Sequence, residues 1–513
     1  MQTFQGKRTL TDAWLWDFLL ASSELPGGIP RMRVLLVSVN RERDPYPVAP
    51  LGLGYVAAAL REAHHEPRVL DLCFSDDVRA EIETAVQEFN PQAVGLGLRN
   101  LDNVSMVAPV SYLDDLKAPL EIVRGLGVEH VFVGGSGFSL VPEAALQYCG
   151  CTLGIVGEGE LAVPALCDRL EAGRPLEDVP GLVRQVDGGF VRTPAVQRPW
   201  QELPRRPARD LIDGDRYLSL GGMANLQTRR GCTFQCVYCT YPLLEGRGMR
   251  LRDVEDVLDE IQGLVEEQGA DYIFFVDDVF TTPPDHAAKI CQGILDRRLR
   301  FHWTGFVNPR CADEVLFALM RKAGCEGVEF GLDVASEAML RRLGKGFTVA
   351  QILESSAACR QVAMPFAHYL LLGGPGETRH TVQETLEVMD RAGASAVFCA
   401  AGMRIYPGTD LHRIALEEGV VRPTDGLLMP TFYCSPEVTG PLMETVQAHA
   451  KQRDNWIIVG LHDAGMREML SLAREYDLRG PLWSYLGQFR RRQRRMANRR
   501  PGGPGAAPRG QAR

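Results

Sequence analysis

The sequence predicts an α/β protein that contains two successive parallel sheets. Near-continuous apolar runs alternate with helical patterns over residues 31–175, and the same alternation resumes over residues 222–415. Strands that alternate with helices form parallel sheets, because each helix returns the chain to the same sheet edge. The chain has 513 residues, of which 45% are hydrophobic and 24% are charged. This composition is ordinary for a globular protein, and the length provides for two or three domains.

The first block, residues 31–175, is predicted to form a doubly wound, Rossmann-like sheet. Its apolar runs, interpreted as parallel strands, are 34–39, 68–72, 93–98, 130–135 and 153–157. Helical patterns cover 52–63, 78–89, 120–126 and 160–171. Ligands bind such sheets beyond the carboxyl ends of the strands. The residues expected there are Leu51, Gly52, Arg99, Asn100, Gly134, Gly135, Ser136, Gly157 and Glu158.

Glycine is frequent at these strand ends, where it lets a large flat ligand approach the backbone closely. The first strand is not followed by the G-x-G-x-x-G pattern, which argues against a nicotinamide dinucleotide. Ordinary turn glycines are the alternative explanation for any one of these segments.

The second block, residues 222–415, follows a connection over 176–221 that contains short strand-like pieces and several prolines. The strands expected in this block are 225–228, 272–280, 301–306, 327–333, 368–372 and 397–403. With helices between them, these strands predict a partial (β/α)6 barrel. In barrels of this kind the functional residues lie at the carboxyl ends of the strands.

Three cysteines follow the first strand of the second block at the spacing C-x3-C-x2-C, as Cys232, Cys236 and Cys239. Thiolates are suitable ligands for zinc and for iron–sulfur clusters. A structural zinc site normally has four ligands, and no further cysteine or histidine pair lies near the loop. Three thiolates around a cubane cluster leave one iron open, and this iron can bind a substrate-like ligand.

This motif resembles that of the radical S-adenosylmethionine (SAM) enzymes. The resemblance implies that the cysteines hold a [4Fe–4S] cluster, whose open iron binds the amino and carboxylate groups of SAM. An electron from the cluster then cleaves SAM to a 5′-deoxyadenosyl radical. The resemblance also implies SAM contacts from Tyr238, Asp277, Asp278, Glu329, Ser336, Gly373 and Gly374.

Some of these positions have structural alternatives. Asp277 and Asp278 precede Pro283, so they are also suited to cap a helix. Glu377 and Thr378 follow the glycines and are suited to the N-terminus of the next helix.

The first block resembles the cobalamin-binding domain that precedes many radical SAM domains. The D-x-H-x-x-G signature, whose histidine ligates cobalt, is absent, and His64 and His65 are expected at the far end of a helix. Arg99 matches an arginine near the lower face of cobalt in the similar tryptophan 2-C-methyltransferases. The resemblance therefore implies cobalamin that is bound without a histidine ligand from the protein.

Together the two resemblances imply a cobalamin-dependent radical SAM methyltransferase. It is expected to transfer a methyl group from SAM, via methylcobalamin, to a carbon or phosphorus of a small metabolite or peptide. A flavodoxin or ferredoxin is the expected electron donor, and a radical and a polar route both stay open. The alternatives are a cobalamin-dependent cyclase or ring-rearrangement enzyme, and a cobalamin-binding regulator with a vestigial barrel.

The remaining segments are less informative. Residues 1–30 form an extension with one short helical pattern at 10–22, and 416–489 are predicted to be a mostly helical domain. Residues 490–513 contain nine arginines and no acids, which is typical of a disordered tail. The net charge is -9, so the chain without the nine arginines of this tail carries about -18, which argues against nucleic-acid binding by the rest of the chain. No apolar run approaches the roughly 20 residues of a membrane span, so we expect a cytoplasmic protein.

Overall fold

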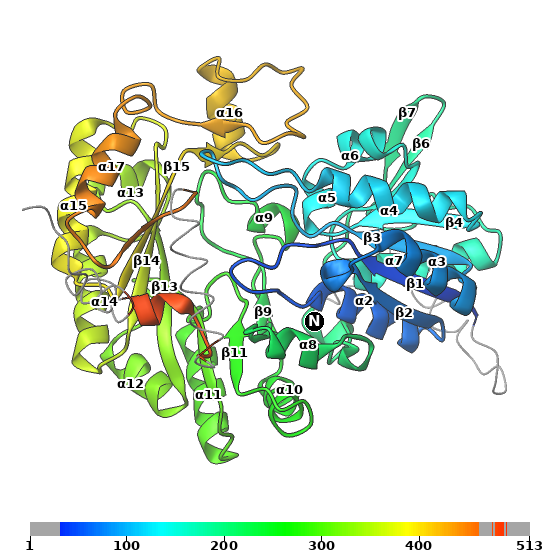
Figure 1. Ribbon diagram of the computed structural model, residues 1–513, viewed down its shortest axis with the longest axis horizontal. Helices are drawn as coiled ribbons and strands as arrows, with labels where there is room; N and C mark the ends of the chain where they lie inside the picture. Colours follow the sequence, from blue (N-terminus) through cyan, green and yellow to red (C-terminus); the bar gives the residue numbers. More distant parts are fainter. Residues whose placement is uncertain (1–30, 461–474, 476–477, 487–488, 490–513) are drawn as a thin grey trace, which may run out of the picture.

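A computed structural model describes residues 31–460, 475, 478–486 and 489 of the chain. The predicted extension over 1–30, its helix at 10–22 and the basic tail over 490–513 lie outside the described residues. The described chain forms two α/β units that lie side by side, the first blue to cyan and the second green to orange in Figure 1.

The N-terminal sheet has the strand order β2-β1-β3-β4-β5-β6-β7. Its five parallel strands are β1 (Arg33–Ser38), β2 (Glu66–Asp71), β3 (Ala93–Gly97), β4 (His130–Gly134) and β5 (Leu153–Ile155). All five were predicted within about two residues at most ends, as is usual for strand boundaries. The antiparallel hairpin β6 (Leu182–Val186) and β7 (Gly189–Arg192) extends this sheet. Part of the predicted connection therefore belongs to the first domain.

Helices cover both faces of this sheet, as a doubly wound fold requires. Val34 and Leu36 of β1 pack in one core with α2 and α7, whereas Leu35 and Val37 pack in the other with α3 and α4. Burial on both faces explains why the strand is a continuous apolar run. The helices are α2 (Leu51–Glu62), α3 (Val78–Phe89), α4 (Leu113–Gly125), α5 (Ser136–Leu140), α6 (Pro142–Cys149) and α7 (Gly159–Glu171).

The second sheet is parallel and has the order β18-β15-β14-β13-β12-β11-β8. Its strands are β8 (Ala224–Leu226), β11 (Tyr272–Phe275), β12 (His302–Val307), β13 (Cys325–Asp333), β14 (Phe366–Leu372), β15 (Ala396–Ala401) and β18 (Trp456–Ile458). Six of these strands confirm the predicted partial barrel, which stays open because β8 and β18 do not pair in the described structure. The seventh, β18, was not predicted, because it lies in the region 416–489, which was expected to be mostly helical. The helix α17 (Leu442–Ala450) belongs to the same region.

Helices on the outside of the second sheet bury one of its faces. They are α10 (Val254–Glu266), α11 (Pro284–Asp296), α12 (Glu314–Lys322), α13 (Glu337–Arg342), α14 (Val349–Gln361) and α15 (Arg379–Ala392). The other face is inside the partial barrel and is only half buried at Phe274, Phe306, Tyr369 and Phe398. Among the described helices, none combines the length and apolar character needed to span a bilayer.

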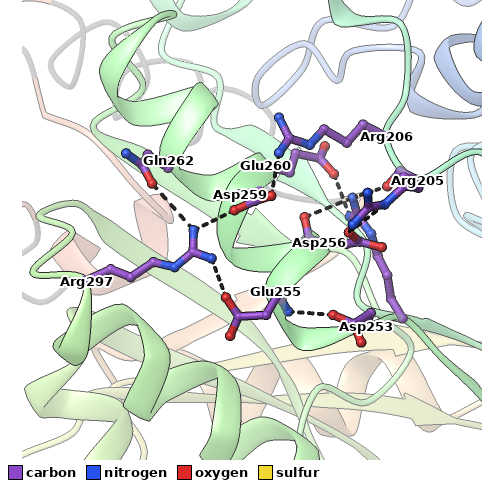
Figure 2. Close-up of polar contacts among 10 residues, drawn as sticks. Arg205, Arg206, Asp253, Glu255, Asp256, Asp259, Glu260, Gln262 and Arg297 are labelled. Carbon is purple, nitrogen blue, oxygen red and sulfur yellow. Dashed lines mark hydrogen bonds and ion pairs between the residues drawn. The ribbon is translucent and has the colours of Figure 1, made fainter.

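The connection between the sheets is fastened along α10 by ion pairs. Arg205 pairs with Asp256, and Arg206 pairs with Asp259 at 2.9 Å (Figure 2). Arg209 Nε donates to Glu260 at 2.7 Å, and this carboxylate is only 3% exposed. The first two pairs are exposed and contribute little, but the buried third pair holds the end of the connection in place.

Candidate active site

The cysteine loop is positioned by three separate parts of the second domain. It follows the short strand β9 (Arg229–Arg230), which pairs with β10 (Arg250–Leu251). The Cys232 amide donates to Gly246 O at 3.0 Å, and the Val237 amide donates to Leu343 O at 3.1 Å. The Val237 carbonyl in turn accepts from the amide of Leu411 at 2.8 Å. The loop is therefore bound at its start and in its middle.

Two glycines are required for the loop to approach its neighbours. Gly231 has a φ of +86°, and a Cβ there would lie 2.0 Å from Gly248 O. Gly344 has a φ of +68°, and a Cβ there would lie 2.3 Å from Gln235 O. Both positions need the left-handed backbone and the missing side chain that only glycine provides.

A buried trio of polar side chains supports the loop from below. Lys345 Nζ lies 2.5 Å from Asp333 Oδ2, and the Tyr238 hydroxyl donates to the same oxygen. Burial opposes the charged form of Lys345, but the neighbouring Asp333 and Cys236 raise its pKa to about 12. Lys345 thus carries a positive charge beside the second cysteine.

Asp333 and Lys345 were not among the predicted site residues. Asp333 ends β13, so an acid at the carboxyl end of a strand was the signal that could have identified it. Lys345 lies on a turn after α13, where nothing in its local pattern distinguishes it from a surface lysine.

The two acids after β11 hold the segment that leads into the loop. Asp277 is 1% exposed and accepts hydrogen bonds from the Thr228 amide at 2.7 Å and the Thr228 hydroxyl at 2.6 Å. Asp278 pairs with Arg229, and its Oδ2 is buried without a partner in the described structure. Neither acid caps α11, so the helix-cap alternative is wrong. The Asp278 carboxylate lies beside the Cys232 thiol.

The remaining predicted SAM contacts lie in β13, just after β13 and just after β14. Glu329 lies mid-strand in β13, where its carboxylate accepts from Trp483 Nε1 at 2.9 Å, rather than at the strand end that the prediction assumed. Ser336 is buried and donates to Glu384 at 2.6 Å. The amides of Gly373 and Gly374 both donate to Glu377 Oε2. Each of these groups already has a protein partner.

The alternatives for the residues after those glycines can be compared with the structure. Thr378 caps α15 and forms a capping box with Thr381, which confirms its role at a helix N-terminus. Glu377 is fully buried, and burial raises its pKa to about 7. Its carboxylate shapes the glycine turn at the end of β14.

Arg99 lies at the end of β3, at the edge of the N-terminal sheet that faces the second domain. Its Nη1 donates to Val48 O at 3.5 Å, and burial lowers its pKa. No ion pair satisfies it among the described residues. His64 and His65 lie beyond α2 at the start of β2, and His65 lies 3.4 Å from Asp168. The structure thus places an arginine at this sheet edge and both histidines elsewhere.

The predicted glycine-rich edge is partly packed and partly open. A Cβ on Gly135 would lie 2.4 Å from Leu98 O, so this glycine serves the packing of β4 on β3. The Ser136 hydroxyl joins the same two strand ends by donating to Arg99 O at 2.7 Å. A Cβ on Gly52 would meet no atom within 4 Å, and one on Gly134 none closer than 3.6 Å. These two positions leave the open backbone that a flat macrocycle needs.

Four other predicted positions frame this edge. Leu51 begins α2, Asn100 follows Arg99, and Gly157 has a φ of +85° in the turn before α7. Glu158 lies in the same turn but points to the second domain, because its carboxylate pairs with Arg250 and is 8% exposed. The residues that follow β5 therefore serve the packing between the domains as well as a candidate ligand site.

Buried ion pairs join the two domains next to the cysteine loop. Arg230, one residue before the glycine that begins the loop, donates to Glu160 at 2.6 Å. Its guanidinium also lies 5.3 Å from the centre of the Tyr55 ring and 4.9 Å from that of Trp200. The same arginine thus links the cysteine loop to the N-terminal domain.

The three cysteines of the loop are the candidate ligands of the cluster. All three are free thiols, and burial raises their pKa values, to about 11 for Cys239. In the part of the chain that the structure describes, no three His, Cys, Asp or Glu side chains converge on a point that would hold one ion. Binding to iron would remove the thiol protons.

Comparison with known proteins decides the family. The model of the B12 binding domain matches residues 37–167, and the model of the radical SAM superfamily matches residues 226–389. An uncharacterised methyltransferase of Pyrococcus horikoshii is 31% identical over 381 residues, which cover 72% of this chain and 79% of that protein. This chain is a cobalamin-dependent radical SAM methyltransferase.

Two further similarities agree with this assignment. The tryptophan 2-C-methyltransferase of Streptomyces laurentii is 27% identical over 476 residues, covering 80% of this chain and 78% of the relative. The structure of the methyltransferase TsrM from Kitasatospora setae, with cobalamin and a [4Fe–4S] cluster bound, has a TM-score of 0.80 and 24% identity. It covers 91% of this chain and 99% of TsrM, which confirms the fold. The cofactors of this methyltransferase are a [4Fe–4S] cluster, SAM and cobalamin.

Proposed function

We propose that this methyltransferase transfers a methyl group from SAM to an unactivated carbon, or a phosphorus, of a small molecule or peptide. Cobalamin, when bound, carries the methyl group between SAM and the acceptor. The names of the similar proteins support a small acceptor, since one is a tryptophan 2-C-methyltransferase and TsrM has been solved with tryptophan. A flavodoxin or ferredoxin supplies electrons to the cluster.

One observation carries this proposal: buried contacts hold the functional edges of the two sheets together. Asp102, in the loop after β3, pairs at 2.8 Å with Arg404 of the short strand β16 (Met403–Arg404), which follows β15. Arg230 and Glu160 join the cysteine loop to the N-terminal sheet. Transfer between two cofactors requires that their sites stay in a fixed relation. These buried pairs support such a relation.

The protein's own residues have three tasks in this proposal. Cys232, Cys236 and Cys239 hold the cluster, and Asp278 places a carboxylate beside Cys232. Arg99 would present a cation to cobalamin from the sheet edge after β3, where it would exclude water and could not act as a metal ligand. A site without water favours group transfer over hydrolysis.

Anaerobic reconstitution with iron, sulfide and cobalamin tests the proposal. The protein is incubated with methyl-labelled SAM and with L-tryptophan as the first acceptor, and the label is followed by mass spectrometry. We expect label on the bound cobalamin even where tryptophan is not methylated. Formation of 5′-deoxyadenosine together with product indicates the radical route, and product without it indicates the polar route.

Cysteine variants provide the control. The triple variant C232A/C236A/C239A should lose both the cubane absorption and the label on cobalamin. Cys311→Ala, a half-buried cysteine after β12, should keep both. A fully loaded wild-type protein that leaves cobalamin unlabelled would contradict the proposed function.

A further inference from the structure

Glu329 is a buried carboxylate that has no cationic partner in the described structure. Its side chain lies on the inner face of the second sheet, and the residue is 3% exposed. Trp483 Nε1 and the Tyr369 hydroxyl donate to it, and no lysine, arginine or histidine of the described chain pairs with it. Burial of an uncompensated charge is costly, so such groups are usually paired or functional.

Aromatic rings surround this carboxylate on the inner face of the sheet. Phe306 is the register partner of Glu329 on the neighbouring strand. Its ring centre lies 5.5 Å from that of Phe274 and 6.2 Å from that of Tyr369, which stacks on Phe398 at 4.6 Å. All four rings are half buried, whereas the residues on the other face of these strands are fully buried. The rings therefore border space inside the partial barrel.

The next inward position confirms that this space is open. Gly331 lies two residues after Glu329 and is the register partner of Tyr369. It is exposed, and a Cβ added there would meet no atom within 4 Å. Below Glu329 the space is closed, because a Cβ on Gly327 would lie 2.7 Å from the Trp483 ring. The hollow thus opens toward the carboxyl ends of the strands, where the cysteine loop lies.

The N-terminal domain also reaches this hollow. Tyr46, from the loop after β1, packs against the same buried cluster around Trp483 as Tyr369 and Phe398. Burial and the nearby charge of Glu329 both raise its pKa, so it stays a neutral donor. The carboxylate is therefore next to an element from each domain, which is where an acceptor between two cofactors would lie.

We infer that this hollow is the acceptor site and that Glu329 binds an ammonium group of the substrate. This inference rests on the proposed function, because it identifies the substrate class of the same site. A carboxylate satisfies the charge and N–H donors of an ammonium group, and aromatic faces attract cations. The rings provide an apolar wall for the rest of the molecule. The acceptor is thus a cationic amine with an aromatic or apolar body.

Matched pairs of amines and alcohols test the inference by binding alone. The probes are 2-phenylethylamine with 2-phenylethanol, and tryptamine with tryptophol, measured by equilibrium dialysis against the reconstituted holoenzyme. We expect at least one amine to bind about tenfold more tightly than its alcohol, the value of one charge-assisted hydrogen bond. Glu329→Gln should remove this preference. Glu326→Gln, at the start of the same strand, where the carboxylate pairs with His302 at 3.0 Å, should keep it.

Stability separates this role from a structural one. A glutamine at position 329 can still accept from Trp483 and Tyr369 through its carbonyl, and it removes the buried charge. We therefore expect the ligand-free Glu329→Gln variant to unfold at the same temperature as the wild type or higher. A clearly lower unfolding temperature would assign Glu329 a structural role and overturn the inference.

Equal binding of amines and alcohols, or no amine binding up to the solubility limit, would overturn it as well. These outcomes are distinct from a failure of the proposed function, which is judged by the label on cobalamin. If cobalamin becomes labelled but no amine is preferred, the proposed function stands and the inference about Glu329 is wrong.

Discussion

Arg404 Nε donates to Asp102 Oδ2 at 2.8 Å and so joins two residues that are 302 positions apart in the chain. Both side chains are at most 1% exposed. The other guanidinium nitrogens donate to the carbonyls of Ile405, Thr431 and Leu427, which leaves no face of Arg404 to water. The pair therefore fixes the loop after β3 against the segment that follows β15.

Removing one partner of this pair should be costly. Arg404→Met leaves Asp102 buried without a counter-charge, which we expect to lower the free energy of unfolding by about 3–5 kcal/mol. The double variant Arg404→Met/Asp102→Leu should recover most of this loss, because no charge remains buried. Denaturant unfolding followed by circular dichroism measures both. Arg413→Ala, which removes exposed pairs, should cost at most about 1 kcal/mol.

The proposed role of Arg99 can be tested through the spectrum of bound cobalamin. If Arg99 lies below the cobalt as proposed, Arg99→Ala makes room there for water, and we expect the paramagnetic resonance spectrum of reduced cobalamin to change toward a water-bound form. Arg99→Lys, which keeps the charge, should resemble the wild type. Identical spectra for the alanine variant and the wild type would show that Arg99 does not control access to the lower face.

Lys345 should influence the redox behaviour of the cluster, since its ammonium lies beside Cys236 and pairs with Asp333. A nearby cation stabilises the reduced, more negative cluster. Lys345→Met should therefore make the midpoint potential of the reconstituted cluster more negative, and Lys345→Arg should largely restore it. Redox titration followed by resonance spectroscopy measures this shift. An unchanged potential in the methionine variant would limit Lys345 to a packing role.

Glu377 predicts a specific dependence of stability on pH. Burial raises its pKa from 4.5 to about 7 in the folded protein, so the folded state binds the proton more tightly than the unfolded state. The contribution of Glu377 to stability is thus complete below pH 4.5 and is lost as the pH rises toward 7. The loss is about 3 kcal/mol, by the conversion of pKa differences to free energy.

The variant Glu377→Gln isolates this effect. The carbonyl of glutamine can accept from the amides of Gly373 and Gly374, and it does not ionise. We expect the fall in stability between pH 4.5 and 7 to be shallower in this variant, as measured by thermal unfolding across the pH range. The same slope in both proteins would contradict the assigned pKa.

The strands and the cysteine loop could be predicted because their signals are local. A continuous apolar run such as 93–98 identifies a buried strand without knowledge of its neighbours. Glu158 and Glu329 could not be interpreted in this way. The partners of Glu158 are arginines of the other domain, and Glu329 meets Trp483 from the end of the chain. Contacts between remote segments leave no periodicity in the sequence.

Strand β18 illustrates the same limit. Its three residues are too short a run to be recognised as a strand, and they become one because the edge of β15 is available for pairing. Lys345 likewise acquires its role only when the turn after α13 meets the cysteine loop.

The contacts of Arg230 affect any attempt to express the two domains separately. Its guanidinium contacts Glu160, Tyr55 and Trp200. Cutting the chain between the domains would therefore remove the counter-charge of Arg230 and the aromatic rings that pack on it. Separately expressed halves should therefore be poor substitutes for the whole protein. Exchange of either half with that of a relative should succeed only when the residues on both sides of this contact come from the same protein.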